Sequence, residues 1–178
     1  MSLAHVDVAI LCGGKQTRAP YLRVPKVLAP IAGRPLVEHI LDRLKKYEAK
    51  RVTLCAGHMA DDIHAWAKQR QKDELQIAVM TETEQRGERA AMQLFFAANP
   101  DCGCVLFWNG DTLIDGDLSW LGKRGSYSFS VRGVPCGICQ MERWDTAVPM
   151  PTYDATGILE FIDIGTPEGY ALAQERYK

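Results

Sequence analysis

Apolar and polar positions recur with two different periods along most of the chain, and these periods predict its secondary structure. Short apolar runs typical of buried strands occupy residues 8–11, 51–56, 75–80 and 104–108. Amphipathic segments with the spacing of helices occupy residues 36–47, 60–71 and 88–98. Strands that alternate with amphipathic helices indicate a parallel sheet covered on both faces. We therefore expect an α/β fold of three layers, α/β/α, around a mostly parallel, Rossmann-like sheet.

The last third of the chain has a weaker pattern. Residues 126–131 have the composition of a strand, whereas residues 132–157 show no clear period. Pro167 suits the first turn of a short terminal helix, which we expect within residues 165–176. No repeat, low-complexity tract or linker divides the sequence, so we expect a single domain over residues 1–178.

Composition and charge narrow the classes of protein. The 178 residues are 47% hydrophobic and 24% charged, which is ordinary for a globular domain. A formal net charge of −1 gives no electrostatic reason to expect a nucleic-acid partner. No apolar stretch is long enough to span a bilayer, and the N-terminus lacks the pattern of a signal peptide. We expect a cytoplasmic protein without a membrane partner, and the sequence leaves a homo-oligomer open.

The chain has six cysteines, Cys12, Cys55, Cys102, Cys104, Cys136 and Cys139. The first two lie in or at the end of apolar runs, so we interpret them as small buried hydrophobic residues. The spacing and surroundings of the other four are poor for a zinc site. Disulfides are uncommon in a cytosolic chain of this size, and free thiols are therefore the expectation.

Candidate chemistry is concentrated directly after the first apolar run. Gly13 and Gly14 let the backbone turn tightly and approach a ligand without an intervening side chain. Arg18 and Lys26 follow on the same connection, and a guanidinium and an ammonium bind phosphate oxygens in different geometries. A loop with two cations at the end of a first strand predicts a nucleoside triphosphate site.

A second polar segment ends another predicted strand. Asn109, Gly110 and Asp111 follow the apolar run at 104–108, and ligands of parallel sheets bind beyond the carboxyl ends of strands. We therefore expect this segment and the glycine loop to converge. Each segment alone has a simpler explanation, because Asn-Gly-Asp is also ordinary turn chemistry and loop cations are usually solvated. Their joint occurrence favours a ligand site.

Together these segments resemble the signature of the sugar-phosphate nucleotidyltransferases. That family has a Gly-Gly-x-Gly-Thr-Arg loop followed by Pro-Lys-x-Leu-x-Pro, and the chain has Gly13-Gly-Lys-Gln-Thr-Arg18 and Pro25-Lys-Val-Leu-Ala-Pro30. Asn109-Gly-Asp111 is a second similarity. Phe161–Tyr170 is similar to the C-terminal part of the guanylyltransferases that act on heptose 1-phosphate and mannose 1-phosphate. The resemblance implies a fold of the nucleotide-diphospho-sugar transferase type.

The resemblance also implies an activity and a set of site residues. The activity is Mg²⁺-dependent transfer of a nucleotide, GMP in particular, from a nucleoside triphosphate to a sugar 1-phosphate, with release of pyrophosphate. Arg18 is the implied cation for pyrophosphate, and Lys26 is the implied cation for the α-phosphate and the sugar phosphate. Asp111 and Asp163 are the implied Mg²⁺ ligands. The implied substrate-binding residues are Leu11, Gly13, Gly14, Gln16, Thr17, Glu82, Gly87, Asn109 and Gly110.

Two departures from the family pattern affect the nucleotide side. Gln16 occupies the position of the third loop glycine, where a left-handed backbone costs a non-glycine residue roughly 1–2 kcal/mol. We expect its side chain to extend toward the phosphates. Glu88 and Arg89 replace small residues of the base-binding segment, and Glu88 adds negative charge near a polyanionic ligand.

A third departure affects the sugar side. The interval from Asp111 to Asp163 is shorter than the family usually has, so residues 118–160 are expected to form a reduced sugar-binding portion. The Glu-Lys-Pro and Asn-Ala-Gly segments of the family are absent, and Val134–Ile138 is only distantly similar to the second.

Functions of different classes remain open at this stage. The leading hypothesis is the nucleotidyltransferase, and the second is a catalytically impaired relative that binds a nucleotide or a sugar nucleotide. Guanylyl transfer to a molybdenum-cofactor-type acceptor shares the fold and a Gly-Gly…Lys loop, but the Pro25–Pro30 and Asp163 segments argue against it. A nicotinamide-binding Rossmann domain is disfavoured because no Gly-x-Gly-x-x-Gly follows the first strand.

Overall fold

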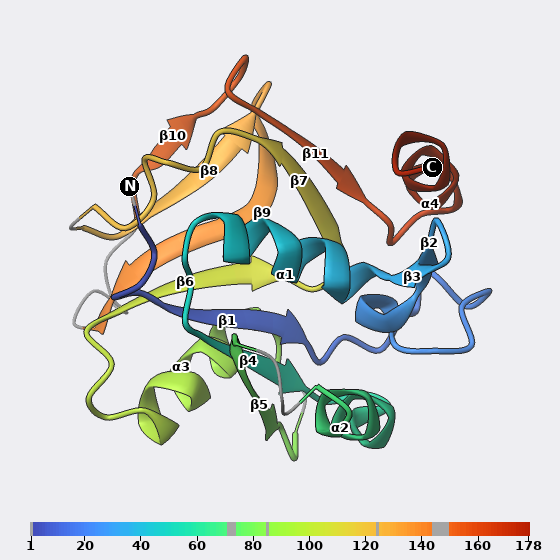
Figure 1. Ribbon diagram of the computed structural model, residues 1–178, viewed down its shortest axis with the longest axis horizontal. Coiled ribbons are helices and arrows are strands. Elements are labelled where there is room, and N and C mark those ends of the chain that lie inside the picture. The colour runs from blue at the N-terminus through green and yellow to red at the C-terminus, as the bar shows by residue number, and fades with distance from the viewer. Residues whose placement is uncertain (1, 71–73, 85, 124, 144–149) are drawn as a thin grey trace.

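A computed structural model describes residues 2–70, 74–84, 86–123, 125–143 and 150–178. Its centre is a seven-stranded sheet with the strand order β10-β8-β9-β6-β1-β4-β5 (Figure 1). The strands of this sheet are β1 (Asp7–Cys12), β4 (Arg51–Ala56), β5 (Gln76–Thr81), β6 (Cys104–Asn109), β8 (Tyr127–Val131), β9 (Val134–Glu142) and β10 (Thr152–Asp154). β1 pairs in parallel with both β4 and β6, and β4 pairs in parallel with β5. The predicted mostly parallel α/β fold is confirmed.

Helices cover both faces of the sheet, as the alternation of periods predicts. They are α1 (Leu36–Lys46), α2 (Ala60–Lys68) and α3 (Glu88–Ala98). The fourth helix, α4 (Pro167–Arg176), packs instead against the C-terminal strand β11 (Leu159–Asp163), outside the main sheet. Val8 and Ile10 of β1 belong to the larger core, together with residues of α1 and α2, whereas Ala9 belongs to the second core with Phe95 of α3. Fully buried strands between two helical layers give the three-layer arrangement.

The last third of the chain contains more strand than its pattern predicts. Strand β9 lies where no period was evident, and consecutive residues Ile138, Cys139, Gln140 and Met141 are all buried. A strand covered on both faces has no alternation of apolar and polar residues, which is why the pattern misses it. This strand runs antiparallel to both β6 and β8.

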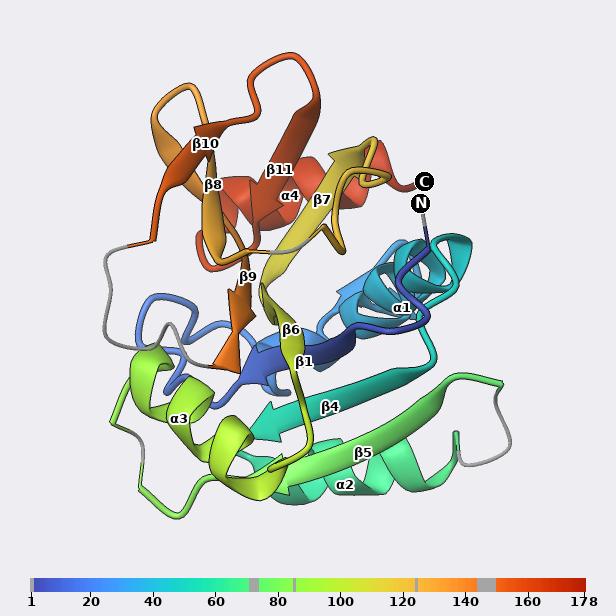
Figure 2. The same ribbon diagram turned by 90° about the vertical axis from the view of Figure 1, so that its left-hand side faces the viewer.

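A short antiparallel ribbon stands apart from the main sheet and was not predicted. Strands β7 (Thr112–Gly116) and β11 (Leu159–Asp163) lie side by side in it (Figures 1 and 2). The ribbon leads into α4, whose start was predicted, and the Thr166 hydroxyl accepts a hydrogen bond from Gly169 N–H as its N-cap. The ribbon thereby carries the C-terminal segment back toward the end of β6.

Three minor elements complete the described chain: η1 (Lys26–Leu28), a single turn of 3₁₀ helix, and the two-residue strands β2 (Pro30–Ile31) and β3 (Arg34–Pro35). All six cysteines are free thiols. Burial raises the pKa of Cys55 and Cys139 to about 12, so these two thiols are protonated at neutral pH.

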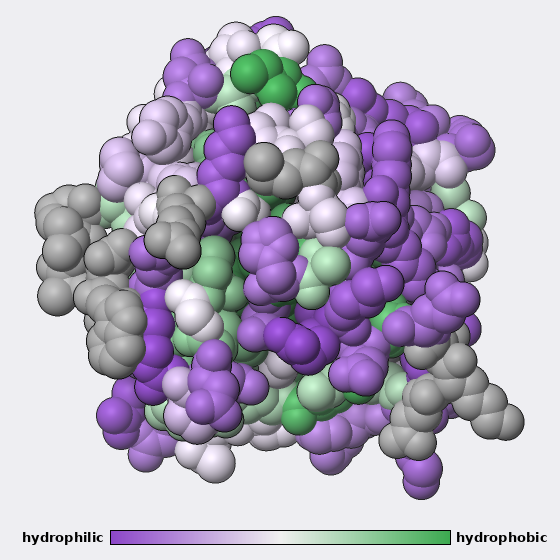
Figure 3. Space-filling view, turned by 60° about the vertical axis from the view of Figure 1, so that its left-hand side comes forward, coloured by the Kyte–Doolittle hydropathy of each residue, from purple (hydrophilic) through white to green (hydrophobic). Residues whose placement is uncertain are grey.

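The surface is predominantly polar on the face shown in Figure 3, where hydrophilic side chains prevail and apolar ones form only small patches. Among the described residues, no helix has both the length and the apolar composition that crossing a membrane requires. The larger apolar side chains are instead gathered in the two cores on either side of the sheet.

Helix α1 ends in a motif that favours glycine. Ala49 N–H donates to Leu44 C=O at 3.1 Å and Glu48 N–H donates to Lys45 C=O at 2.9 Å, the two hydrogen bonds of a Schellman motif. Glu48 stands at the left-handed position of this motif, with φ of 63°, and its side chain is exposed. A left-handed backbone is strained for any residue with a Cβ atom.

We expect Glu48→Gly to stabilise the protein by about 0.5–1 kcal/mol, because relief of the left-handed strain exceeds the entropy cost of glycine. Chemical denaturation measures the change. Glu48→Ala is the matched control, since it removes the carboxylate and keeps the strain, and we expect it to leave the stability unchanged. Equal effects of the two variants would contradict the strain argument.

Candidate active site

The carboxyl ends of β1 and β6 open onto a cavity of about 510 Å³. The predicted site residues that line it are Leu11, Gly13, Gly14, Gln16, Thr17, Arg18, Lys26, Glu82, Gly87, Asn109, Gly110 and Asp111. The structure thus brings together the glycine loop, the segment around Glu82 and the Asn-Gly-Asp segment. Lys15 also lines the cavity and adds a third cation that the sequence reasoning did not single out.

The two polar segments meet because β1 and β6 pair in parallel. Leu11 lies opposite Asn109 in the register, and Gly110 N–H donates to Leu11 C=O at 2.9 Å just beyond the strand ends. A Cβ atom at Gly110 would lie 2.8 Å from that same carbonyl oxygen. Only glycine permits this approach, so Gly110 sets the distance between Asp111 and the glycine loop.

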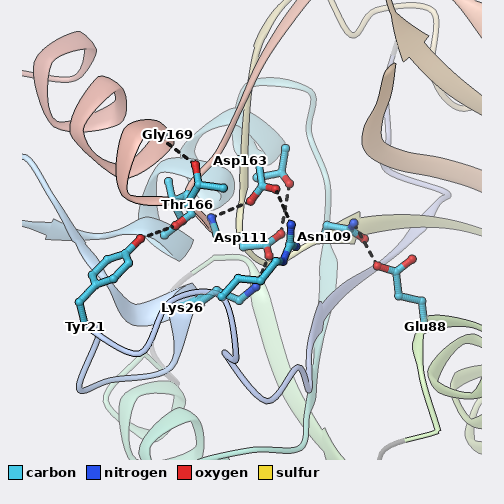
Figure 4. A network of polar contacts seen from close by, with 12 residues as sticks. Tyr21, Lys26, Glu88, Asn109, Asp111, Asp163, Thr166 and Gly169 are labelled. Carbon is cyan, nitrogen blue, oxygen red and sulfur yellow. Dashed lines mark hydrogen bonds and ion pairs between the residues drawn. The ribbon is translucent and has the colours of Figure 1, made fainter. Parts of the chain in front are cut away.

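Two carboxylates converge beside Gly165. The β7–β11 register places Asp163 opposite Thr112, and Ile164 N–H donates to Asp111 C=O at 2.9 Å. Asp163 Oδ1 and Asp111 Oδ2 lie 2.8 and 3.6 Å from the point that a Cβ atom of Gly165 would occupy. Figure 4 shows the two side chains pointing toward one another from different elements.

This pair of carboxylates fits a magnesium ion. Mg²⁺ binds proteins through one or two carboxylates and completes its shell with substrate phosphates and water. Asp163 Oδ1 also accepts Gly165 N–H at 2.7 Å, which holds the carboxylate in place. Among the described residues, no group of three or more Asp, Glu, His or Cys side chains is arranged to hold a metal ion. A phosphate ligand and water would complete the shell of a cation at this pair of carboxylates.

The two predicted catalytic cations are held differently. Lys26 Nζ forms an ion pair with Asp111 Oδ2, and both side chains are more than four-fifths buried. The Arg18 side chain is 68% exposed, and its Nη1 lies 3.9 Å from Asp163 Oδ2. Lys26 is therefore positioned next to the carboxylates before any ligand binds, while Arg18 extends from the loop into solvent. A cation at Asp111 would compete with Lys26 for the same oxygen.

The loop departs from the expectation at Gln16. Its backbone is left-handed, with φ of 56°, as a glycine position would be. Its side chain makes a contact within the loop that was not expected, because Oε1 accepts the backbone N–H of Lys26 at 2.7 Å. The residue thus ties the two parts of the loop together at the wall of the cavity.

Glu82 is a buried carboxylate under the glycine loop. It is 8% exposed, and its Oε1 lies 3.1 Å from the position that a Cβ atom of Gly13 would take. Burial raises the pKa of the Glu82 carboxyl above its ordinary value of 4.5. Because Gly13 has no side chain, the Glu82 carboxylate fits beneath the loop. Hydrogen-bond donors of a ligand would be suitable partners for this carboxylate.

The other departures lie on a different part of the site. Asn109 Nδ2 is 3.3 Å from Glu88 Oε1, and Glu88 lines the cavity at the start of α3 (Figure 4). Arg89 lies outside the cavity lining. Gly137, from the segment with only distant similarity, comes close as well, since a Cβ atom there would lie 3.3 Å from Asn109 Cβ. The signal in the sequence was Gly137 itself, because a glycine inside a strand often marks an irregularity or a close approach, and its φ is 78°.

The sequence matches the family model described as MobA-like NTP transferase domain over residues 8–119, more than half of the chain. The chain belongs to this nucleotidyltransferase family. The matched range contains the glycine loop, Glu82 and Asp111, whereas Asp163 lies beyond it.

Bifunctional GlmU proteins are among the relatives of this NTP transferase chain. It is 34% identical over 109 residues to GlmU of Paracidovorax citrulli (strain AAC00-1), and 42% identical over 63 residues to GlmU of Acidovorax sp. (strain JS42). These matches cover 61% and 35% of the chain, but only 23% and 13% of the relatives. The part of the chain that matches therefore covers less than a quarter of the length of either GlmU protein.

Solved structures extend the similarity to nearly the whole NTP transferase chain. HddC from Yersinia pseudotuberculosis, complexed with GMP-PN, superposes with a TM-score of 0.80 at 18% identity over 97% of this chain and 100% of HddC. UDP-glucose pyrophosphorylase from Acinetobacter baumanii gives a TM-score of 0.79 at 11% identity over 99% and 93% of the two chains. These structures confirm the nucleotide-diphospho-sugar transferase fold. With the family match and the GlmU relatives, they support the sugar-phosphate nucleotidyltransferase family that the motifs resemble.

The raised pKa of Glu82 makes stability depend on pH. The native carboxyl binds its proton more tightly than the unfolded one, so the free energy of unfolding falls as pH rises from the ordinary value of 4.5 through the raised native value. We expect Glu82→Gln to be more stable than the native protein above this range and to lose that advantage below it. Denaturation at pH 4 and pH 7.5 measures the difference.

Glu175→Gln is the control, because Glu175 is exposed on α4 and carries the same chemistry without burial. The expectation would be contradicted if both variants gained the same stability at pH 7.5, or if Glu82→Gln gained none. Either result would show that burial of the Glu82 carboxylate does not lower the free energy of unfolding.

Proposed function

We propose that this chain transfers a nucleotide, GMP in particular, from a nucleoside triphosphate to a sugar 1-phosphate in a Mg²⁺-dependent reaction. The observation that carries the proposal is the convergence of Asp111, Asp163, Lys26 and Arg18 beside a cavity lined by a glycine loop. Two carboxylates and two cations next to one cavity suit a polyphosphate and its metal ion. The family match and the sugar-nucleotide enzymes among the structural relatives support the same chemistry.

The reaction requires placement and charge neutralisation more than covalent help from the protein. An oxygen of the sugar phosphate attacks the α-phosphorus, and the bond from that phosphorus to the oxygen of the departing pyrophosphate breaks. The attacking oxygen is already anionic, so no general base is needed. Lys26, beside Asp111, would neutralise the α-phosphate and the incoming phosphate, and the exposed Arg18 would neutralise the charge on the departing pyrophosphate.

Asp111 and Asp163 would hold the Mg²⁺ ion, whose positive charge lowers the energy of the crowded phosphate oxygens when it is bound. In the protein alone, the Lys26 ammonium pairs with Asp111 and compensates part of the carboxylate charge. With a cation held by Asp111 and Asp163, the Lys26 ammonium would be available to pair with the phosphates of the nucleotide instead. Lys26 would therefore pair with Asp111 in the free protein and with the phosphates in the complex.

Preference for guanine follows from the chemistry of Glu82. An ionised carboxylate only accepts hydrogen bonds, and guanine presents two adjacent donors, N1–H and the N2 amino group. Uracil and thymine present one N–H between two carbonyl oxygens, which a carboxylate repels. The resemblance of Phe161–Tyr170 to guanylyltransferases and the HddC complex with GMP-PN support the same base.

The proposed partners are accordingly two small molecules, a nucleoside triphosphate and a sugar 1-phosphate, and neither a nucleic acid nor a membrane. Nucleoside triphosphates are cytoplasmic metabolites, which supports a cytoplasmic location. Residues 118–160 would supply the reduced sugar-binding portion, and Gly137 is the part of it that lies next to Asn109.

Calorimetric titration with GTP, ATP, UTP and CTP, with and without Mg²⁺, tests the nucleotide site. We expect magnesium-dependent binding of GTP and at least tenfold weaker binding of UTP. Glu82→Gln should narrow the ratio of the two affinities, because its amide presents a donor where the carboxylate presents only acceptors. Glu175→Gln again serves as the control. Failure of every nucleotide to bind a well-folded sample would exclude the proposal.

Turnover separates an enzyme from a binding module. With GTP and a panel of sugar 1-phosphates, we expect Asp111→Asn to reduce release of pyrophosphate by at least a hundredfold, because the metal loses a ligand and Lys26 its partner. Asp61→Asn, an exposed carboxylate at the start of α2, should leave the rate unchanged. GTP binding without any pyrophosphate release would favour the catalytically impaired relative.

A further inference from the structure

Gln16 occupies a strained position that glycine would occupy without cost. Its φ of 56° is in the left-handed region, and it lies in the loop between the first strand and η1. A long side chain in such a position suggests that its amide makes interactions that a glycine would lack. The carbonyl oxygen and the amino group of that amide each have a separate part in the argument for a role at the cavity.

The carbonyl end positions Lys26. Gln16 Oε1 accepts the backbone N–H of Lys26 at 2.7 Å, and a backbone N–H can only donate, which identifies the oxygen. Lys26 opens the η1 turn, where an N–H has no partner within the helix, and Pro25 before it provides no side-chain cap. Gln16 supplies the missing acceptor from ten residues away. This fixes the backbone from which the Lys26 ammonium reaches Asp111.

The amino end remains available to a ligand. Within the described parts of the chain, Nε2 of Gln16 has no hydrogen-bond partner, and the residue lines the cavity together with Lys15, Arg18 and Lys26. Three cations line the same cavity as this donor, whose orientation is restrained by the hydrogen bond at the other end of the same amide. The ligand that suits two N–H donors among three positive charges is a phosphate oxygen.

We propose that Gln16 has two roles, positioning Lys26 through its carbonyl oxygen and binding an oxygen of the triphosphate through its amino group. The inference rests on the proposed function for its second role only. A third glycine would let the loop backbone approach the phosphates closely. In this chain the amino group of the Gln16 side chain would take that place, held in position before the nucleotide binds.

Two substitutions separate the roles. Gln16→Gly removes both interactions and also relieves the left-handed strain. Gln16→Glu keeps an acceptor for Lys26 N–H but has no donor and adds a negative charge. Glu48→Gly is the matched control, since it relieves the same strain at the end of α1, far along the chain from the cavity lining. Hydrogen exchange of the Lys26 amide, Tm, and titration with inorganic tripolyphosphate and with GTP and Mg²⁺ are measured on each protein.

We expect slow exchange of the Lys26 amide in the native protein and in Gln16→Glu, and fast exchange in Gln16→Gly. Affinity for tripolyphosphate should fall roughly tenfold to a hundredfold in both Gln16 variants, the loss of one hydrogen bond to a charged group. Affinity for GTP should fall in parallel. Glu48→Gly should bind both ligands like the native protein.

Fast exchange of Lys26 in the native protein, or slow exchange in Gln16→Gly, would overturn the positioning role. Unchanged tripolyphosphate affinity in both Gln16 variants, or no binding to the native protein, would overturn the phosphate role. A native protein that binds tripolyphosphate but no nucleotide would refute the proposed function, while the comparison of variants would still decide the role of Gln16.

Discussion

The parallel pairing of β1 with β6 is the interaction on which the site depends. It places Leu11 opposite Asn109, so the two chain segments that carry the loop and Asp111 leave the sheet at the same edge. The hydrogen bond from Gly110 N–H to Leu11 C=O then continues the contact beyond the last strand residues. Burial of both strands between two helical layers holds this register, because a slip would exchange side chains of different size between the two closely packed cores.

The second constraint is the β7–β11 ribbon. It lies outside the main sheet and brings a segment more than fifty residues away along the chain next to Asp111, with Ile164 N–H bonded to Asp111 C=O. Gly165 then leaves open the space that both carboxylates face. Backbone pairing therefore assembles the proposed cation site.

Several residues of the candidate site lower the free energy of unfolding of the protein, which is typical of residues kept for a function. Glu82 is a carboxylate with a raised pKa in a buried place, and Gln16 holds a left-handed backbone without being glycine. Glu48 also has a left-handed backbone, but it is exposed and lies outside the cavity lining. At Gln16 the strained backbone accompanies an interaction with Lys26, whereas at Glu48 it accompanies only the end of a helix.

The sequence by itself determined the alternation of strands and helices, the three-layer fold, and the convergence of the glycine loop with Asn109-Gly-Asp111. These follow from local periodicity and from the rule that parallel strands present their carboxyl ends at one edge. It missed β9, whose burial on both faces removes the alternation, and the β7–β11 ribbon, whose pairing depends on residues far apart in the chain. Only the tertiary structure decided that Asp163 faces Asp111, that Gly137 lies beside Asn109, and that Gln16 bonds to Lys26. Such contacts depend on the path of the whole backbone, and no local pattern of residues encodes them.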